Sequence, residues 1–518
     1  MNNEQTNEKT FLLSESVFAW LCYFAGYAFC RCFPVMDYPL GGFLFILALF
    51  TATIIFFIIQ KRKFAILPLL VAISAIAISV SLLLSTNKFL YFWTFAYALA
   101  AYCYFVYSVL DNNIEKGFSN LILLDFFKAI IILPFCSLGK LFVAMFTGKA
   151  RASGKTIGKI FLGLAVTIIP TFIVTLLLSY DSNFIDLLDK ILDFDIAAVF
   201  SHIFSFGFAI PIGMFLFGLY NSASENKCKE TINAISCKKA YQATKFVPAV
   251  TVIAAVIPLV FLYVIFFISQ WDYYISGFVG YLPEEFSYAE YAREGFFQLC
   301  AVAVINLIII LAIVLFMRRN IEQPSPVLKI VSITFSICTL ILISTAIAKM
   351  IMYIKSYGLT PKRVYATWFM CLVALIFIII IISQITRRIK AVAVSFFACV
   401  ILLTGLSLSN IDQIIAQYNV NRYINGTLKT VDMNAMDDLG DAAIPELVRL
   451  AEYLDSKYDT DISAEACESD DELYDQLYYK LNSISLEFKN REENNSFFSK
   501  TIPEIKAINA LKRIGLLK

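Results

Sequence analysis

The polar residues with the most unusual spacing lie in a short segment, 280–295, between two apolar stretches. Its sequence, GYLPEEFSYAEYAREG, contains a proline followed by two glutamates, which favours a helix N-terminus because backbone amides there attract negative charge. On such a helix Glu290 and Glu294 share one face, while Tyr288 and Tyr291 share another. Carboxylates and phenols grouped in this way can bind a polar ligand or exchange protons with it.

Two later polar strings are predicted to join this segment. The first, KSYGLTPKRVY, lies between two apolar stretches and carries Lys355, Lys362 and Arg363, and the second follows the last apolar stretch. We therefore predict a polar ligand-binding site, in which the cations face the glutamates across a shared cleft. A clamp that joins the same segments without a ligand is the alternative. The predicted site residues are Glu284, Glu285, Tyr288, Glu290, Arg293, Glu294, Lys355, Lys362, Arg363, Asp412 and Asn419.

No motif for a catalytic or metal centre accompanies these residues. His202 is the single histidine, so neither a Ser-His-Asp triad nor a zinc-protease motif can form. There is no Walker loop and no dinucleotide-binding glycine pattern. Most of the 12 cysteines stand singly in apolar stretches without a CxxC motif, which is typical of buried small apolar residues. We predict no catalytic residue, no metal site and no cofactor.

The composition defines the elements that must position the polar strings. Hydrophobic residues make up 59% of the 518 residues and charged residues 16%, and the mean hydropathy is +0.73. The apolar residues fall in blocks of about 20, the length that a helix needs to cross about 30 Å of hydrocarbon. This predicts an all-α, polytopic transmembrane helix bundle of about eleven spans. They are Val17–Phe33, Leu40–Ile59, Phe64–Leu84, Phe89–Leu110, Ile157–Ser179, Ile203–Asn221, Val247–Ile268, Phe296–Met317, Ile330–Ala348, Val364–Thr386 and Ala391–Ser409.

The charges of the connecting loops predict the orientation. Five loops rich in Lys and Arg, such as 60–63 and 227–245, fall on one side of an eleven-span bundle, which the positive-inside rule assigns to the cytoplasm. The N-terminus is then cytoplasmic and the C-terminus extracytoplasmic, in a bacterial cytoplasmic membrane. The loop that holds Lys355, Lys362 and Arg363 breaks the pattern, because it carries positive charge on the outer side.

Two segments differ from the spans. Residues 118–147 are apolar but carry Asp125, Lys128 and Lys140 within one helical sector, so we predict a kinked amphipathic helix at the cytoplasmic interface, or alternatively a re-entrant hairpin. Residues 410–518 hold 20 acidic and 12 basic residues and show apolar residues at helical spacing from Leu473 to Phe488. The sequence thus predicts two domains, a membrane region over 1–409 and an acidic helical C-terminal domain over 410–518.

The three polar strings carry a family resemblance. LPEEFSYAEYAREGF at 282–296, YGLTPKRVY at 357–365 and the string from Asn410 to Asn419 resemble the bacterial membrane proteins grouped as domain of unknown function 4173, a relative of family 4153. The resemblance extends from about Pro39 into the C-terminal region. It implies a multi-pass membrane protein with these outer motifs, and it supplies no catalytic residues.

Three functions fit these observations. The leading hypothesis is a non-enzymatic envelope component that binds a ligand or a protein partner at its outer face, as a sensor or accessory subunit. The alternative is a channel or uncoupled transporter, in which Pro170, Pro211 and Pro258 break their helices. The third is an enzyme acting on a lipid-linked substrate. The bilayer is the expected environment, and the absence of a basic stripe with exposed aromatic residues argues against nucleic acid.

The orientation can be tested with reporter fusions that are active only outside the cytoplasm. We expect a fusion after Ser409 to be active and a fusion within 226–239 to be silent, because the second segment lies among basic loops. A silent fusion after Ser409 would mean that the spans are miscounted, and the outer-face site would then be withdrawn.

Overall fold

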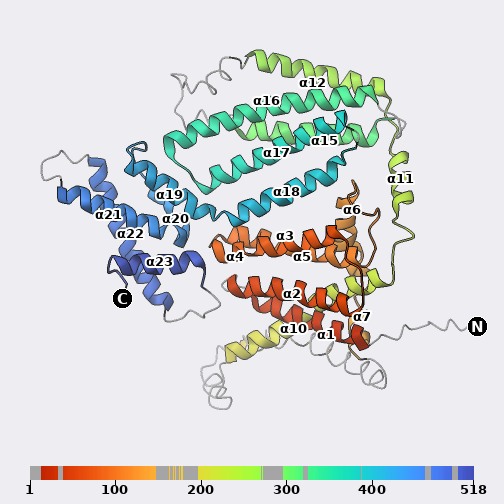
Figure 1. The fold of residues 1–518 in the computed structure, drawn as a ribbon, viewed down its shortest axis with the longest axis horizontal. Coiled ribbons are helices and arrows are strands. Elements are labelled where there is room, and N and C mark those ends of the chain that lie inside the picture. Colours follow the sequence, from red (N-terminus) through yellow and green to blue (C-terminus); the bar gives the residue numbers. More distant parts are fainter. Residues whose placement is uncertain are drawn as a thin grey trace, which may run out of the picture. The chain divides into compact units, whose positions relative to one another are not determined.

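The computed structural model is built from helices (Figure 1). It describes residues 13–32, 39–146, 196–269, 296–318, 325–386, 388–460, 468–492 and 500–517, together with residue 271 and six single residues from 163 to 178. These residues contain no β-strand, only an isolated bridge between Val247 and Met317. The chain divides into two compact units, the first formed by 1–79, 92–114 and 123–231 and the second by 80–91, 115–122 and 232–518.

Ten helices of the described residues are long and apolar enough to cross a membrane. They coincide with ten of the eleven predicted spans, and nearly all of the eleventh, Ile157–Ser179, lies outside the described residues. The predicted all-α polytopic bundle is confirmed. The ninth predicted span, Ile330–Ala348, is too short, because its helix runs from Pro326 to Tyr357 and accommodates Lys349 and Lys355.

The first unit holds five of the long helices. Its elements are α1 (Leu13–Cys32), α2 (Pro39–Ile59), α3 (Ile66–Ser79), α5 (Lys88–Val109, from Phe92 onward), α6 (Ile122–Phe127, from Leu123 onward), the π-helical turn η1 (Lys128–Ile132), the 3-10 turn η2 (Pro134–Ser137), α7 (Lys140–Met145) and α10 (Ile196–Ser224). Aromatic rings pack in its interior: Phe18 is stacked on Phe56 at 4.1 Å and tilted against Tyr220 at 4.8 Å, measured between ring centroids.

Helices α1 and α10 approach each other closely because glycines form their contact. A Cβ atom at Gly26 would lie 2.6 Å from the carbonyl oxygen of Ala209, and one at Gly213 would lie 3.0 Å from Cα of Tyr23. Within hydrocarbon there is no hydrophobic driving force between helices, so close backbone packing through small residues supplies much of the attraction.

The segment 118–147 is more broken than the single kinked helix that we predicted. It forms α6, η1, η2 and α7, and two of the three charges that were expected to face water are buried: Asp125 is 2% exposed and Lys128 is 1% exposed. Asp125 Oδ1 accepts hydrogen bonds from the Tyr107 hydroxyl at 2.7 Å and from the backbone amide of Ile114 at 2.9 Å. These partners draw the carboxylate inward. The position of the segment at an interface stays a prediction.

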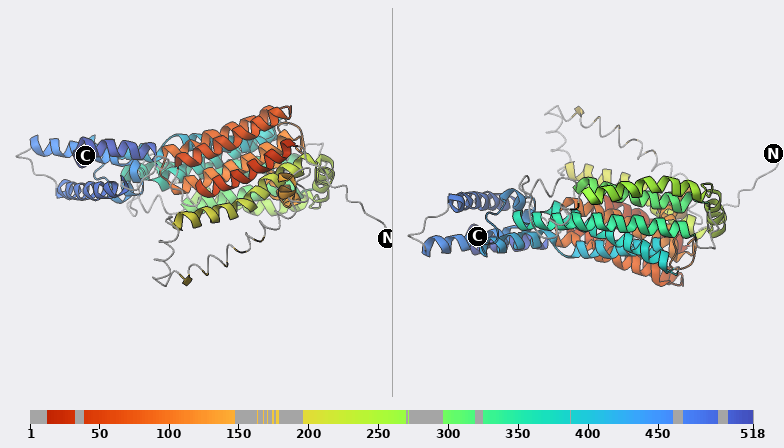
Figure 2. Two further views of the ribbon diagram at one scale, coloured as in Figure 1. Left: turned by 90° about the horizontal axis from the view of Figure 1, so that it is seen from below. Right: turned by 90° about the horizontal axis from the view of Figure 1, so that it is seen from above.

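The second unit holds a bundle with a helical region at one end (Figures 1 and 2). Its bundle elements are α4 (Ser81–Leu84), the first turn of α5, α11 (Ala234–Ala243), α12 (Ala249–Ser269), α15 (Phe296–Phe316), α16 (Pro326–Tyr357), α17 (Pro361–Ile385) and α18 (Ala391–Leu408). Inside the bundle, Asn306 accepts a hydrogen bond from Tyr263 at 2.6 Å and donates one to Thr339 at 2.8 Å. Because both side-chain groups of Asn306 have partners, this buried amide links three helices.

The C-terminal helices form their own apolar core beyond the ends of α16, α17 and α18 (Figure 2). They are α19 (Ile411–Ile424), α20 (Met433–Asp437), the 3-10 turn η4 (Gly440–Ala442), α21 (Ile444–Thr460), α22 (Glu468–Glu492) and α23 (Ile502–Arg513). A capping box begins α23, since the side chains of Thr501 and Glu504 each accept a hydrogen bond from the other's backbone amide. Leu473, Leu477, Leu481 and Phe488 are buried in this core, as their spacing predicts.

The glycine contact between α1 and α10 can be tested by substitution. We expect Gly26→Ala to lower the thermal unfolding temperature of the detergent-solubilised protein, because the added Cβ overpacks the contact at a cost of about 1–3 kcal/mol. Gly405→Ala on α18 is the control, since nothing lies within 4 Å of its added Cβ. Equal unfolding temperatures for the two variants would show that the close approach does not contribute to stability.

Candidate functional site

The described part of the chain contains five of the predicted site residues, and they lie where α16, α17 and α19 meet. Lys355 lies in the last turn of α16, and Lys362 and Arg363 lie in the first turn of α17. Asp412 and Asn419 belong to α19. The other six lie outside the described residues: Glu284, Glu285, Tyr288, Glu290, Arg293 and Glu294. Their pairing with the basic loop therefore stays a prediction.

Asn419 holds the turn between α16 and α17. Its Oδ1 accepts a hydrogen bond from the backbone amide of Leu359 at 2.7 Å, and its Nδ2 donates to the carbonyl of the same residue at 2.8 Å. Gly358 has φ +76°, and a Cβ there would lie 2.5 Å from Asn419 Oδ1. The glycine is required both by its left-handed backbone and by the close approach of the amide. Thr360 then begins α17 as its N-cap, with Pro361 in the first turn.

Two arginines donate hydrogen bonds to carbonyl groups at the end of α16. Arg363 Nη1 donates to the carbonyls of Tyr357 at 3.0 Å and Gly358 at 2.5 Å, and Arg422 Nη1 donates to that of Ile354 at 3.1 Å. The guanidinium of Arg363 also lies 3.9 Å above the Tyr353 ring. Cations near a helix C-terminus interact favourably with its dipole. These contacts give the positive charge at position 363 a role that requires no glutamate partner.

Asp412 is the most unusual group of this region. It lies in the first turn of α19, is 3% exposed, and accepts a hydrogen bond on Oδ2 from the Ser85 hydroxyl at 2.9 Å. Among the described residues, Oδ1 has no hydrogen-bond partner. Burial raises the pKa of this carboxyl, and the Ser85 hydrogen bond opposes that shift. Asp412 is therefore a buried carboxyl that holds its proton to higher pH than an aspartate in water.

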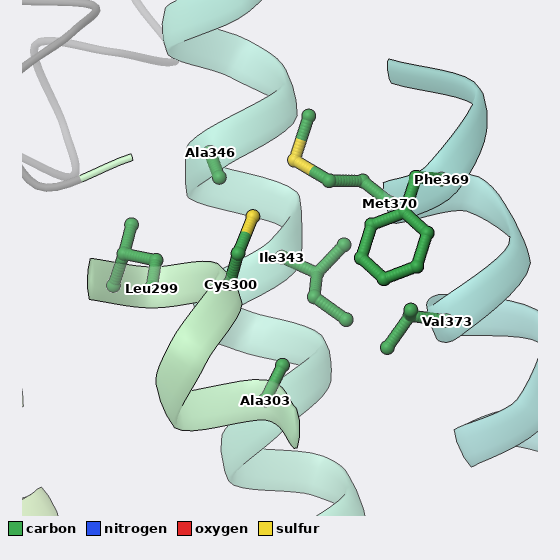
Figure 3. Close-up of a pocket in the computed structure, with 8 residues that line it drawn as sticks. All are labelled: Leu299, Cys300, Ala303, Ile343, Ala346, Phe369, Met370 and Val373. Atoms are coloured by element: carbon green, nitrogen blue, oxygen red, sulfur yellow. The ribbon is translucent and has the colours of Figure 1, made fainter. Parts of the chain in front are cut away.

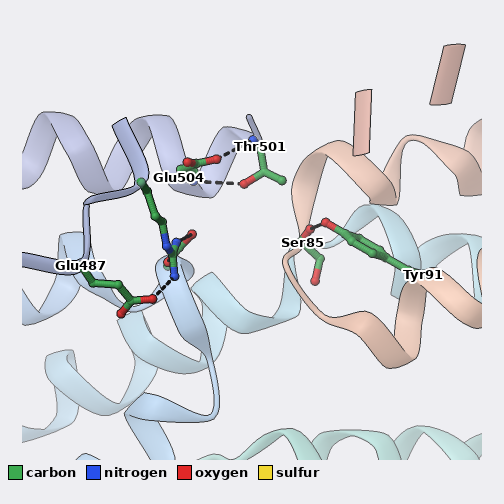
Figure 4. A network of polar contacts seen from close by, with 7 residues as sticks. Ser85, Tyr91, Glu487, Thr501 and Glu504 are labelled. Carbon is green, nitrogen blue, oxygen red and sulfur yellow. Dashed lines mark hydrogen bonds and ion pairs between the residues drawn. The ribbon is translucent and has the colours of Figure 1, made fainter. Parts of the chain in front are cut away.

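A short turn of the chain, Ser85–Asn87, supplies the hydrogen-bond donor to Asp412. Asn87 Nδ2 donates to the hydroxyl of Tyr365 at 3.1 Å, and the Tyr91 hydroxyl donates to the carbonyl of Ser85 at 2.6 Å (Figure 4). Sequence reasoning missed this turn, although three polar residues, STN, between two apolar stretches were the available signal. The partner residue Asp412 is 327 positions away, and local patterns do not predict such a pairing.

Further carboxylates surround an arginine in the adjoining C-terminal helices. Arg491 Nη1 contacts both carboxylate oxygens of Asp441 at 3.2 Å, and its Nη2 donates to Glu487 at 2.5 Å (Figure 4). Burial raises the pKa of the Asp441 carboxyl, and the charge of Arg491 opposes this. Burial also raises the pKa of Glu504, which accepts a hydrogen bond from the Thr501 amide at 3.3 Å. No group of three or more metal-ligating side chains occurs among the described residues.

An apolar pocket lies within the bundle, between α15, α16 and α17 (Figure 3). Its volume is about 10 Å³, room for roughly one water molecule, and it is lined by side chains of the three helices. They are Leu299, Cys300, Ala303, Ile343, Ala346, Phe369, Met370 and Val373. This lining offers neither a charge nor a hydrogen-bonding group other than a thiol, so it cannot orient a polar substrate.

The helices and the junction define a class of protein, a polytopic all-α integral membrane protein with a helical C-terminal region docked on its bundle. The chain belongs to the family described as Domain of unknown function (DUF4153), which matches residues 72–450. The resemblance to family 4173 is not confirmed. The family that matches is 4153, the relative of family 4173. The search of curated proteins and the search of solved structures found no match.

The buried carboxyl makes a prediction about pH. Because burial raises the pKa of Asp412 above its ordinary value of 3.8, the folded protein holds this proton to higher pH than the unfolded chain. The free energy of unfolding therefore falls as pH rises through the folded pKa. Asp412→Asn removes this titration and keeps an acceptor for Ser85. We expect the variant to unfold at a higher temperature than the wild type at neutral pH.

The difference should shrink as pH falls toward 3.8, because the wild-type carboxyl is then protonated as well. Thermal unfolding in detergent between pH 4 and pH 8 measures it, with the exposed Asp438→Asn as the control. A variant less stable than wild type at neutral pH would show that the ionised carboxylate stabilises the fold.

Proposed function

We propose that this protein is a non-enzymatic membrane component that binds a protein partner through its C-terminal domain, on the extracytoplasmic side. One observation carries the proposal: the outward face of α22 exposes large apolar side chains. Tyr479 is 80% exposed and Leu486 is 62% exposed. Because they are seven residues apart, they lie on the same side of the helix.

The two faces of α22 differ in burial. Leu473, Leu477 and Leu481 point into the C-terminal core and are no more than 5% exposed. That core accounts for the folding of the domain without any contribution from Tyr479 or Leu486. Aromatic and large apolar side chains at the centre of a polar surface are typical of the anchor residues of protein interfaces.

The charge of the domain indicates the chemistry of its partner. With 20 acidic and 12 basic residues in 410–518, the domain has a net charge of −8. Glu472, Asp475 and Glu487 are exposed on α22 itself. A partner with an apolar pocket and a basic rim would complement this surface, and opposite charges would speed its association.

The junction with α16 and α17 supports a role as an accessory subunit or sensor. Leu359 and Val364, from the turn between these helices, pack against the core of the C-terminal helices. Asn419 adds its two hydrogen bonds to Leu359. A force on the domain would therefore reach the bundle through packed side chains rather than through a flexible linker.

The transport alternative receives less support from the helices. Pro211 and Pro258 lie inside α10 and α12, and both helices continue through them. A transporter site of the predicted kind needs a helix that is interrupted at such a position. The glutamate-rich segment 280–295 remains a predicted ligand site at the outer face.

Photo-crosslinking in intact membranes tests the proposal. With a photoreactive residue at Ser483, which is exposed between Tyr479 and Leu486, we expect one discrete adduct. The double substitution Tyr479→Ala and Leu486→Ala should reduce its yield at least about tenfold, because interface anchors contribute about 2 kcal/mol or more. Raised salt should also weaken the adduct, since the complementary charges are exposed.

The control variant is Asn482→Ala, on the same face but without apolar surface, which should keep the adduct. A second control places the photoreactive residue at Lys512 on α23, where no adduct is expected. If Ser483 gives no adduct, or if the adduct survives the double substitution, α22 does not bind a partner and the proposal fails.

A further inference from the structure

Two cysteines of the first unit lie within reach of each other. The Sγ atoms of Cys136, in η2, and Cys228, just after α10, are 3.9 Å apart, although the residues are 92 positions apart. Cys136 is exposed and Cys228 is half-buried. The other free cysteines of the described residues have no such neighbour within hydrogen-bonding distance, so this pair differs from the thiols that fill gaps in the bundle.

Several contacts hold the two cysteines in place. A Cβ at Gly218 would lie 2.4 Å from the carbonyl oxygen of Pro134, so α10 and η2 approach through backbone atoms. Asn221 Nδ2 donates to the hydroxyl of Ser137 at 3.1 Å. Lys227 Nζ donates to the same hydroxyl at 2.6 Å. These contacts involve neighbours of both cysteines, so the thiol pair is positioned before any reaction takes place.

We propose that Cys136 and Cys228 are a redox modification site, which closes to an intramolecular disulfide by exchange with a low-molecular-weight disulfide. The thiolate of Cys136 attacks the external disulfide RSSR, forms a mixed disulfide and releases RS⁻. The thiolate of Cys228 then attacks the Cys136 sulfur and releases the second RS⁻. Two electrons and two protons leave the cysteine pair, RSSR becomes two RSH, and an external thiol reverses the reaction.

The exposure of the two thiols assigns the order of these steps. Cys136 is accessible to a reagent in water, whereas the half-buried Cys228 is placed to resolve the mixed disulfide. Burial and the neighbouring thiol raise the pKa of Cys136, and the Lys227 ammonium opposes this. Since only the thiolate attacks, the rate should rise with pH, by up to about tenfold per unit while the thiol is mostly protonated.

The surroundings of the pair indicate the compartment. Lys227 and Lys229 lie beside it, in one of the loops whose positive charge predicts the cytoplasmic side. Thiols are kept reduced there, and cytoplasmic disulfides usually act in sensing or catalysis rather than as permanent links. The disulfide would therefore form under oxidising conditions and would join η2 covalently to the end of α10.

The experiment treats the purified full-length protein with oxidised glutathione in the presence of a chelator. Peptide mapping by mass spectrometry should find Cys136 linked to Cys228, and maleimide labelling should show the loss of two thiols, restored by reduced glutathione. Cys136→Ser and Cys228→Ser should each prevent the link, whereas Cys237→Ser should leave it unchanged. The single Cys228→Ser variant should instead accumulate the glutathione adduct at Cys136.

Gly218→Ala provides a test that keeps both cysteines. The added Cβ must displace η2 from α10, so we expect disulfide formation to slow at least about tenfold, with an unchanged rate in Gly405→Ala. Thermal unfolding of each variant shows that it is folded before oxidation. If the wild type carries separate glutathione adducts on both cysteines and no link, or if Cys237→Ser prevents the link, the pair is not the proposed site.

Discussion

A helix that ends at the edge of a bilayer leaves its last carbonyl groups without partners, and hydrocarbon supplies none. At the end of α16, Arg363 supplies donors to the carbonyls of Tyr357 and the capping Gly358, whereas Arg422 adds a second hydrogen bond to the Ile354 carbonyl, which already accepts the Gly358 amide. Arg363 begins the next helix of the bundle, whereas Arg422 belongs to α19. Arg422 thus links the C-terminal region to the end of a transmembrane helix by a hydrogen bond.

The burial of the Asp412 carboxyl in α19 costs free energy when the carboxyl is ionised. A carboxyl that is 3% exposed and bonded through one oxygen to Ser85 favours its protonated form. The N-terminal turn of α19 reduces that cost, because its free amides stabilise negative charge. Replacement by an apolar residue would leave the Ser85 hydroxyl without its acceptor. The hydrogen bond from Ser85 to Asp412 thus connects the turn 85–87 to α19, and its strength depends on whether the Asp412 carboxyl is ionised.

Much of the fold follows from composition, because the bilayer prescribes both helix formation and helix length. Ten of the spans could be located from apolar blocks alone. The site was only partly predictable. Its basic string was noticed because its charge broke the loop pattern, but glutamates were expected as partners, whereas Arg363 binds carbonyls. Ser85 was missed because its pairing with Asp412 is long-range. Asp125 was expected to face water, but its hydrogen bonds to Tyr107 and to the Ile114 amide hold it inside.

The packing of the C-terminal helices against the α16–α17 turn also limits how the C-terminal region can function. A domain joined by a flexible linker could bind a partner without affecting the bundle, whereas here Leu359 and Val364 of the α16–α17 turn belong to the packing of the C-terminal core. Packed cores have discrete arrangements rather than continuous ones, so a partner that rotates α19 must also change the hydrogen bonds of Asn419 and Arg422 to the turn. Binding energy gained on α22 would then act on the end of α16. For this reason Arg363 and Arg422, at the end of α16, are also the groups through which the C-terminal region would influence the bundle.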